Sequence, residues 1–350
     1  MTAAGTSDAP ADWECVKVVG RAGTTNHYQF PTPKSSTSTI DKSLACMALW
    51  NAECKAVRVC APPRLGKTMM MSTLRAFFCV VTPRDMPGSL RGDQATFDSA
   101  AARANRMGEF GGSLLCQRHP EFFDAHFGCY PVISLQFNIL PTSTFQGICR
   151  SVALHVMSEL SSWASAIDRD GLDTKQLAVL DEAAEIIQAV KTSVYRASVD
   201  RLKGLATEMF TLLSKVLEHV YRRRFILLID GYDEPLIAAA NRSWADDVRS
   251  FYIETLGLML RDKMLEKALL AGTYPVPLGS DGSLDMENMA TVSLGINGAA
   301  EHLGPGAQQP TGFVAVLGTM YGYTERGLLE IMDSDRSFLK ASPARIANVE

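Results

Sequence analysis

The 350-residue sequence contains no uninterrupted apolar run of the length that a membrane helix needs. Such a helix takes about 20 predominantly apolar residues, and the best candidate, residues 69–81, is interrupted by Arg75. The N-terminus also lacks the basic and apolar regions of a secretory signal peptide. We therefore expect no membrane partner and a cytoplasmic or other intracellular location, with the nucleus not excluded.

Paired cysteines are also missing. All eight cysteines precede residue 150, and none belongs to a C-x-x-C pair or to a regular spacing. In a chain of this size, that distribution favours reduced thiols and agrees with an intracellular setting.

The chain has no excess of positive charge, because 34 basic residues are outweighed by 38 acidic ones. The overall charge therefore does not indicate a nucleic-acid partner, although it does not exclude a basic patch on part of the surface. The run 222–224 consists of three arginines, and we interpret it as a solvated helix end, where cations suit the helix dipole.

The segment CAPPRLGKTMM, residues 60–70, carries the most informative motif. It matches the phosphate-binding loop pattern G-x-x-x-x-G-K-[ST] except that Ala61 replaces the first glycine. A β-branched run precedes the segment and an apolar helical pattern follows it, as a P-loop requires. We predict that ATP phosphates are held by the loop and the helix N-terminus, through Arg64, Leu65, Gly66, Lys67, Thr68 and Met69.

A second motif, FILLID at residues 225–230, is an apolar strand that ends on an acid. A P-loop NTPase needs such a strand, called Walker B, to bring a carboxylate beside the loop. We predict that the Thr68 hydroxyl binds Mg²⁺ and that Asp230 binds it through a water molecule.

Strand and helix patterns alternate along the chain, which predicts an α/β fold: a P-loop NTPase with a largely parallel sheet flanked by helices. The expected strands are residues 56–60, 130–137, 225–230 and 267–273. Residues 144–224 are helical almost throughout and form a large helical insertion or subdomain; a further helix is expected over 245–266.

We expect three segments. Residues 1–38 form a flexible lead-in, 39–300 the P-loop domain, and 301–350 a loop with the start of a C-terminal helical region, including a helix candidate at 324–332. The chain is expected to be a short or truncated form without a further C-terminal module.

Several boxes, in order, resemble the AAA-ATPase-like family of predicted P-loop ATPases. They are the loop with its following helix, a preceding T-I-D-K-S, H-F-G-C-Y-P-V-I, the Walker B box L-I-D-G-Y-D-E-P-L, L-L-A-G and a late Y-G-Y-T-E, over residues 39 to 332. The resemblance implies an ATP-binding, Mg²⁺-dependent ATPase that acts as a nucleotide-driven switch on a protein partner or within a homo-oligomer.

The departures from the family pattern concern hydrolysis. The acid that directly follows the Walker B aspartate activates water in such ATPases, but here Gly231 occupies its position. Asp233 or Glu234 is a substitute, with Asp233 preferred because the family pattern retains it; Lys67 is the remaining catalytic candidate. The sensor-like threonine of the family is Ala271, with Thr273 two residues later.

Three functions remain open. The first is an ATPase-type switch, with Arg249 and Arg261 as candidate arginine fingers. The second is a pseudo-ATPase, a nucleotide-gated binding or scaffold module that does not turn ATP over, which Gly231 favours. The third, a P-loop kinase, needs an acceptor pocket that the sequence does not reveal.

Overall fold

The computed structural model describes residues 18–19, 39–63, 66–80, 99–137, 143–167, 169, 172–274, 289–294 and 300–301. A short strand β1 (Val18–Val19) pairs antiparallel with β2 (Thr39–Ile40). The predicted lead-in apart from β1, the loop residues Arg64 and Leu65, and the helix candidate 324–332 lie outside the described residues. The predicted domain boundaries stay predictions.

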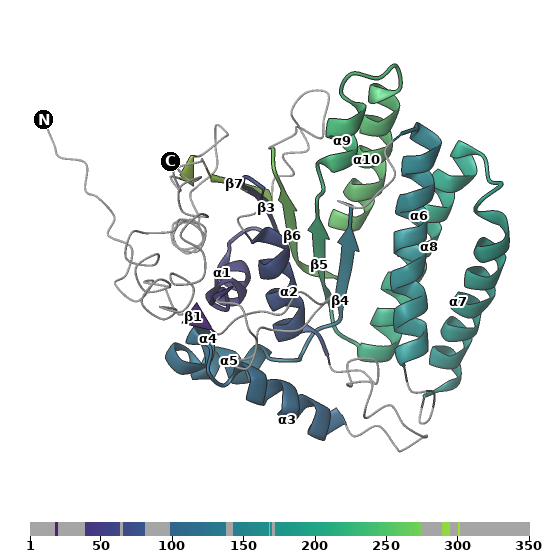
Figure 1. Ribbon diagram of the computed structural model, residues 1–350. Coiled ribbons are helices and arrows are strands. Elements are labelled where there is room, and N and C mark those ends of the chain that lie inside the picture. Colours follow the sequence, from purple (N-terminus) through teal and green to yellow (C-terminus); the bar gives the residue numbers. More distant parts are fainter. Residues whose placement is uncertain are drawn as a thin grey trace, which may run out of the picture.

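A six-stranded sheet in the order β4-β5-β6-β3-β7-β8 forms the centre of the molecule (Figure 1). Its first five strands are parallel to one another, and β8 pairs antiparallel with β7. This arrangement confirms the predicted α/β class with a largely parallel sheet. The strands are β3 (Ala56–Cys60), β4 (Val132–Gln136), β5 (Phe225–Asp230), β6 (Leu265–Gly272), β7 (Met289–Leu294) and β8 (Ala300–Glu301).

Burial explains which strands the sequence reveals. Every residue of β3 and of β5 is buried, as expected for parallel strands that are covered on both faces. Both strands have the predicted bounds. Strand β7 is absent from the strands expected from the sequence. It lies in a stretch rich in Gly, Pro and Asn, and its parallel partner β3 is more than 200 residues away.

Helices cover both faces of the sheet. The chain leaves β3 through α2 (Lys67–Phe78) and reaches the edge strand β4, then returns through β5 and β6. Because parallel crossovers are right-handed, the reversal of direction places α2 on the opposite face from α10 (Ala245–Leu260). Helix α10 ends before the predicted residue 266, since the Asp262 carboxylate accepts the Met264 N–H at 2.7 Å and turns the chain into β6.

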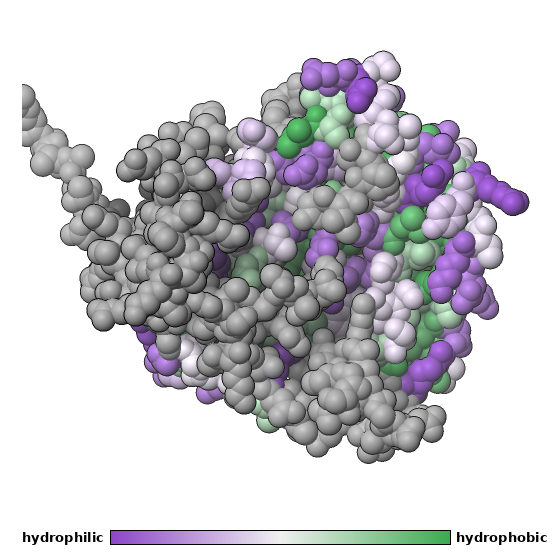
Figure 2. Space-filling view, viewed as in Figure 1, coloured by the Kyte–Doolittle hydropathy of each residue, from purple (hydrophilic) through white to green (hydrophobic). Residues whose placement is uncertain are grey.

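The predicted helical portion consists of α6 (Phe145–Ala166), α7 (Thr174–Ser193) and α8 (Val199–Tyr221). Side chains cap all three N-termini, including a capping box at the start of α7. Helices α6 and α8 pack on each other and share one hydrophobic core with the sheet. The outward surface of α7 is mainly hydrophilic (Figure 2).

The remaining helices are shorter. Helix α1 (Leu44–Asn51) packs on α2 and α4, and α9 (Glu234–Ala239) follows β5 directly. Helices α3 (Ser99–Phe110), α4 (Leu114–Arg118) and α5 (Pro120–His126) lie below the sheet in Figure 1. No helix of the described residues is long and apolar enough to span a membrane.

Candidate functional site

The loop after β3 enters α2 through a left-handed residue. Gly66 has φ 79° and forms the N-cap of α2, a conformation that costs glycine nothing. At the other end of the loop, Ala61 is buried, and its N–H donates to the Gly272 carbonyl at 3.0 Å. Ala61 is not among the described residues with positive φ, so alanine fits where the motif has its first glycine.

Lys67 is the first residue of α2, and its side chain folds back over the loop. Its Nζ donates to the carbonyls of Ala61 at 2.5 Å and Pro62 at 2.9 Å. Burial lowers the pKa of Lys67, and the charges of Asp230 and Asp233 oppose that shift. The loop is therefore closed around an ammonium group at a helix N-terminus, where anions are favoured.

The two predicted motifs meet through one hydrogen bond. The Thr68 hydroxyl donates to Asp230 Oδ2 at 2.6 Å, across 162 positions of sequence. Asp230 is only 6% exposed, and burial raises the pKa of its carboxyl, against the hydrogen bond from Thr68 and the charge of Lys67. Because β3 and β5 run parallel, their carboxyl ends lie at the same edge of the sheet, which brings these side chains together.

Gly231, directly after Asp230, also has a left-handed backbone, with φ 68°. Its N–H and that of Tyr232 both donate to the Ala271 carbonyl, at 2.8 and 3.2 Å. An L-residue in this conformation costs about 1–2 kcal/mol. The turn therefore gives a physical reason why glycine stands where the family pattern has an acid.

Asp233 is wholly buried and holds the end of β6. Its Oδ2 accepts the backbone N–H groups of Thr273 at 2.7 Å and Tyr274 at 2.8 Å. Its Oδ1 is buried without a hydrogen-bond partner, and a Cβ on Gly272 would lie 2.5 Å from that oxygen. Gly272 thus permits the close approach of Asp233. Through its two hydrogen bonds, Asp233 connects the turn after β5 with the residues that follow β6.

Glu234 begins α9 and is exposed, unlike its neighbour. The pKa of Glu234 is raised, first by partial burial and then by the charge of Asp233, while the charge of Lys67 lowers it. This carboxylate therefore shares the electrostatic environment of Lys67 and Asp230 and remains accessible to solvent. The sensor-like position carries no side chain beyond the Ala271 methyl, and Thr273 is half-buried at the same edge.

One residue of the site was missed as a candidate. Lys42, from the T-I-D-K-S segment, is 7% exposed, and its Nζ donates to the Gly66 carbonyl at 3.3 Å. Burial lowers the pKa of Lys42 to about 8, with the charge of Lys67 as the second cause. The T-I-D-K-S likeness was the only sequence signal, and spacing alone does not reveal a contact across 24 residues.

A family model described as "Predicted AAA-ATPase" matches residues 94–280, more than half of the chain. The chain belongs to the AAA-ATPase-like family. No curated protein and no solved structure matches it. The match of this AAA-ATPase-like protein includes Asp230, the turn after it and the end of β6, while the loop at 61–68 lies upstream of the matched residues. Family membership supports nucleotide binding and a predicted ATPase at that coarse level.

The residues at the loop fit a Mg²⁺ ion. A hydroxyl and a carboxylate oxygen meet at 2.6 Å, and Mg²⁺ takes oxygen ligands, usually one or two from protein with the rest from water and phosphate. The described residues hold no group of three His, Cys, Asp or Glu side chains suited to a metal, and a Mg²⁺ site of this kind does not require one.

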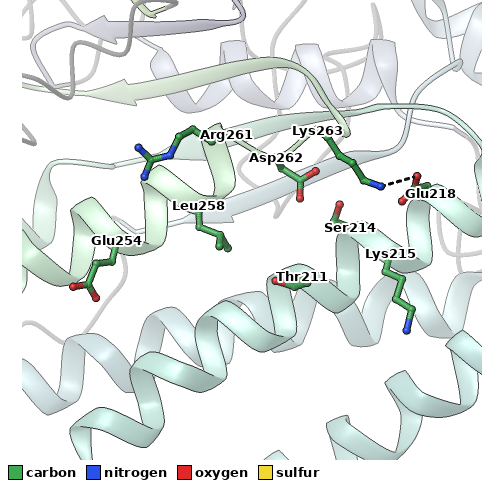
Figure 3. A pocket seen from close by; sticks show the side chains of 9 residues that line it. All are labelled: Thr211, Ser214, Lys215, Glu218, Glu254, Leu258, Arg261, Asp262 and Lys263. Atoms are coloured by element: carbon green, nitrogen blue, oxygen red, sulfur yellow. Dashed lines mark hydrogen bonds and ion pairs between the residues drawn. The ribbon is translucent and has the colours of Figure 1, made fainter.

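The two arginine-finger candidates occupy different parts of α10, its first half and its C-cap. Arg249 is in the first half of α10, close in sequence to the turn after β5, and lies 4.0 Å from Asp246. Arg261 follows the end of α10 and lines a groove of about 740 Å³ between α8 and α10 (Figure 3). Along this AAA-ATPase-like chain, Arg249 is in the half of α10 nearer to β5, whereas Arg261 lies shortly before β6.

The groove in Figure 3 has charges of both signs. Lys215 and Lys263 line it together with Glu218 and Asp262, and Lys263 pairs with Glu218 at 3.3 Å. Such a lining favours no single class of ligand.

The arginine run 222–224 has local partners. Arg222 lies 3.9 Å from Asp173, Arg223 donates to the Cys129 carbonyl at 3.2 Å, and Arg224 pairs with Glu266 at 3.4 Å. These contacts support the interpretation of the run as a helix end.

We predict that Asp233→Ala lowers the free energy of unfolding by about 2–4 kcal/mol, because the backbone N–H groups of Thr273 and Tyr274 lose the buried carboxylate that accepts both of them. Asp233→Asn keeps an acceptor oxygen and is expected to cost less than half as much. Urea denaturation measures both variants, and a loss below about 1 kcal/mol for the alanine variant would contradict the structural role.

We also predict a pH effect from Lys42. Its pKa rises from about 8 in the folded protein to 10.5 in the unfolded chain, so the unfolded state binds more protons between these values and stability rises with pH. Relative to Lys42→Met, the wild type is expected to gain about 2 kcal/mol between pH 8 and 10, at 1.36 kcal/mol per pKa unit. Urea denaturation at several pH values in this range measures the free energy of unfolding of both proteins. A difference between them that does not change with pH would refute the prediction.

Proposed function

We propose that this AAA-ATPase-like protein binds Mg-ATP at the carboxyl edge of the sheet and hydrolyses it. The observation that carries the proposal is the Thr68–Asp230 hydrogen bond of 2.6 Å. If the Gly-Lys-Thr sequence were a coincidence in a turn, a hydrogen bond between its threonine and the acid at the end of an apolar strand would not be expected. A P-loop beside a Walker B strand requires that meeting.

In this proposal, the loop residues Arg64 to Met69 surround the phosphates with backbone N–H groups at the start of α2. Lys67 exchanges its two carbonyl acceptors in the loop for oxygens of the β- and γ-phosphates. Thr68 would bind Mg²⁺ directly, and Asp230 would bind it through a water molecule. Mg²⁺ bound there neutralises charge on the phosphate oxygens.

Glu234 is the residue that we propose as the general base. The sequence favoured Asp233, but that carboxylate is buried and already accepts two backbone N–H groups. Glu234 is exposed, and its raised pKa brings it closer to the range in which a carboxylate accepts a proton effectively. It lies four residues after Asp230, at the same edge.

We further propose that the nucleotide state is passed to helices α6–α8. Helix α8 ends at Tyr221 and β5 begins at Phe225, so a shift of Asp230 along β5 acts directly on the end of α8. A protein partner or a second copy of the chain would read that shift.

A second candidate function is a nucleotide-gated scaffold that binds ATP without turnover. The left-handed backbone at Gly231 supports it, because this turn disfavours an acid at the position where related ATPases activate water. The two candidates share the binding site and differ only in phosphate release.

We predict that Lys67→Ala and Thr68→Val each weaken Mg-ATP binding at least tenfold, and that the valine variant loses the Mg²⁺ dependence of binding. Thr73→Val is the matched control, since Thr73 is a buried threonine of the same helix whose hydroxyl donates to the Met69 carbonyl at 3.0 Å. Calorimetry with and without Mg²⁺ measures the effect. Unchanged affinity in Lys67→Ala would refute the P-loop assignment.

We predict that Glu234→Gln lowers phosphate release by about 10²–10⁴-fold, the usual contribution of a general base, while Mg-ATP affinity stays within a factor of about three. Glu185→Gln is the matched control, because Glu185 is an exposed glutamate of α7.

The outcomes separate the two functions. If the wild type releases phosphate and Glu234→Gln releases it at the same rate, Glu234 is not the general base. Tight binding without any release by the wild type would favour the scaffold.

A further inference from the structure

Asp41, Lys42 and Ser43 are three consecutive polar residues in the protein interior, with exposed fractions of 2%, 7% and 0%. Polar groups at this depth need partners. Asp41 Oδ1 accepts the Ser43 N–H at 2.8 Å and fixes the turn into α1. Further side-chain hydrogen bonds of the segment run to two different parts of the molecule.

Asp41 and Ser43 bind the start of α4. Asp41 Oδ2 accepts the Leu114 N–H at 2.8 Å, and the Ser43 hydroxyl accepts the Leu115 N–H at 3.0 Å. These oxygens satisfy N–H groups that the first turn of a helix leaves without partners. The backbone on both sides of Lys42 is therefore fixed.

Lys42 reaches instead to the loop before α2. Its Nζ donates to the Gly66 carbonyl at 3.3 Å, and a Cβ on residue 66 would lie 2.5 Å from that nitrogen. The left-handed φ of 79° favours glycine at position 66, and a side chain there would displace the ammonium group of Lys42. A displacement of the Gly66 carbonyl would therefore change the contact with Lys42.

The positive charges of this region converge on one short segment. Lys67 follows Gly66 in sequence, the N-terminus of α2 begins there, and the charge of Lys67 is one of the two causes that lower the pKa of Lys42. Bringing two ammonium groups and a helix N-terminus together is unfavourable in a partly buried site. A bound polyanion reverses the sign of that interaction, because it attracts all three.

We propose that Lys42 is a positioning residue of the phosphate site, which holds the Gly66 carbonyl and supplies a second positive charge, besides Lys67, for the phosphates of the nucleotide. This inference rests on the proposed function, since it concerns the same ligand. It extends the site to a residue 24 positions before the loop and gives the buried lysine a role beyond packing.

The test compares the wild type with Lys42→Met, Lys42→Gln and Lys267→Met in the full chain. Methionine removes the charge and the donor, whereas glutamine keeps a donor without charge. Lys267 is the matched control, a half-buried lysine that donates to the Cys54 carbonyl at 3.2 Å at the opposite edge of the sheet. Calorimetry measures affinity for Mg-ATP, inorganic tripolyphosphate and AMP, and thermal denaturation verifies folding.

Both Lys42 variants are expected to bind Mg-ATP and tripolyphosphate about tenfold more weakly, which is the effect of losing one charged contact. Their affinity for AMP is expected to stay unchanged, and Lys267→Met is expected to bind all three ligands as the wild type does. In the wild type, affinity for tripolyphosphate is expected to fall between pH 7.5 and 9 as Lys42 loses its proton, more steeply than in Lys42→Met. If the methionine variant does not fold, the pH dependence of tripolyphosphate affinity can be compared between the wild type and Lys42→Gln.

The results that would overturn the inference are distinct. If the wild type binds Mg-ATP and both Lys42 variants bind it equally well, Lys42 has no part in the site, while the proposed function stands. If glutamine restores full affinity, the charge is unnecessary and the inference is wrong. If the wild type binds neither Mg-ATP nor tripolyphosphate, the proposed function itself fails.

Discussion

The parallel register of β3, β6 and β5 is the constraint on which the rest of the site depends. Cys60 pairs with Gly272, and Ala271 pairs with Asp230, so three strands end at the same level of the sheet. The loop after β3, the turn after β5 and the end of β6 therefore meet at one edge, although they lie far apart in sequence. The Thr68–Asp230 hydrogen bond follows from this register, because neither strand alone can place its partner.

The same edge explains how the acids of the Walker B box are distributed. The turn after Asp230 is closed by the Ala271 carbonyl, which accepts two N–H groups, and this closure requires the left-handed backbone of Gly231. Asp233 then secures the end of β6 from inside the protein. Of the acids that follow Asp230 in the box, Glu234 alone remains accessible. The buried and the accessible carboxylate therefore lie side by side in the sequence, Asp233 holding the end of β6 and Glu234 facing solvent.

A second set of contacts connects the loop to the helices that precede β4. Residues 41–43 bind the start of α4 with two side chains and the loop with the third. The loop is therefore held from the sheet side by Ala61 and Gly272 and from the helix side by Lys42. The contacts of the loop thus connect the sheet with the helices that precede β4.

The sequence by itself determined the elements whose signal is local. Strand 225–230 was predictable because a parallel strand buried on both faces is a continuous apolar run, and strand 56–60 because β-branched and small apolar residues flank its single arginine. The helical portion was predictable because its apolar positions recur at helical spacing. Strand β7, the burial of Asp233, the exposure of Glu234 and the contact of Lys42 with Gly66 were decided by tertiary structure alone. Burial and hydrogen-bond partners depend on residues that the fold brings from other strands and helices, and one sequence position carries no record of them.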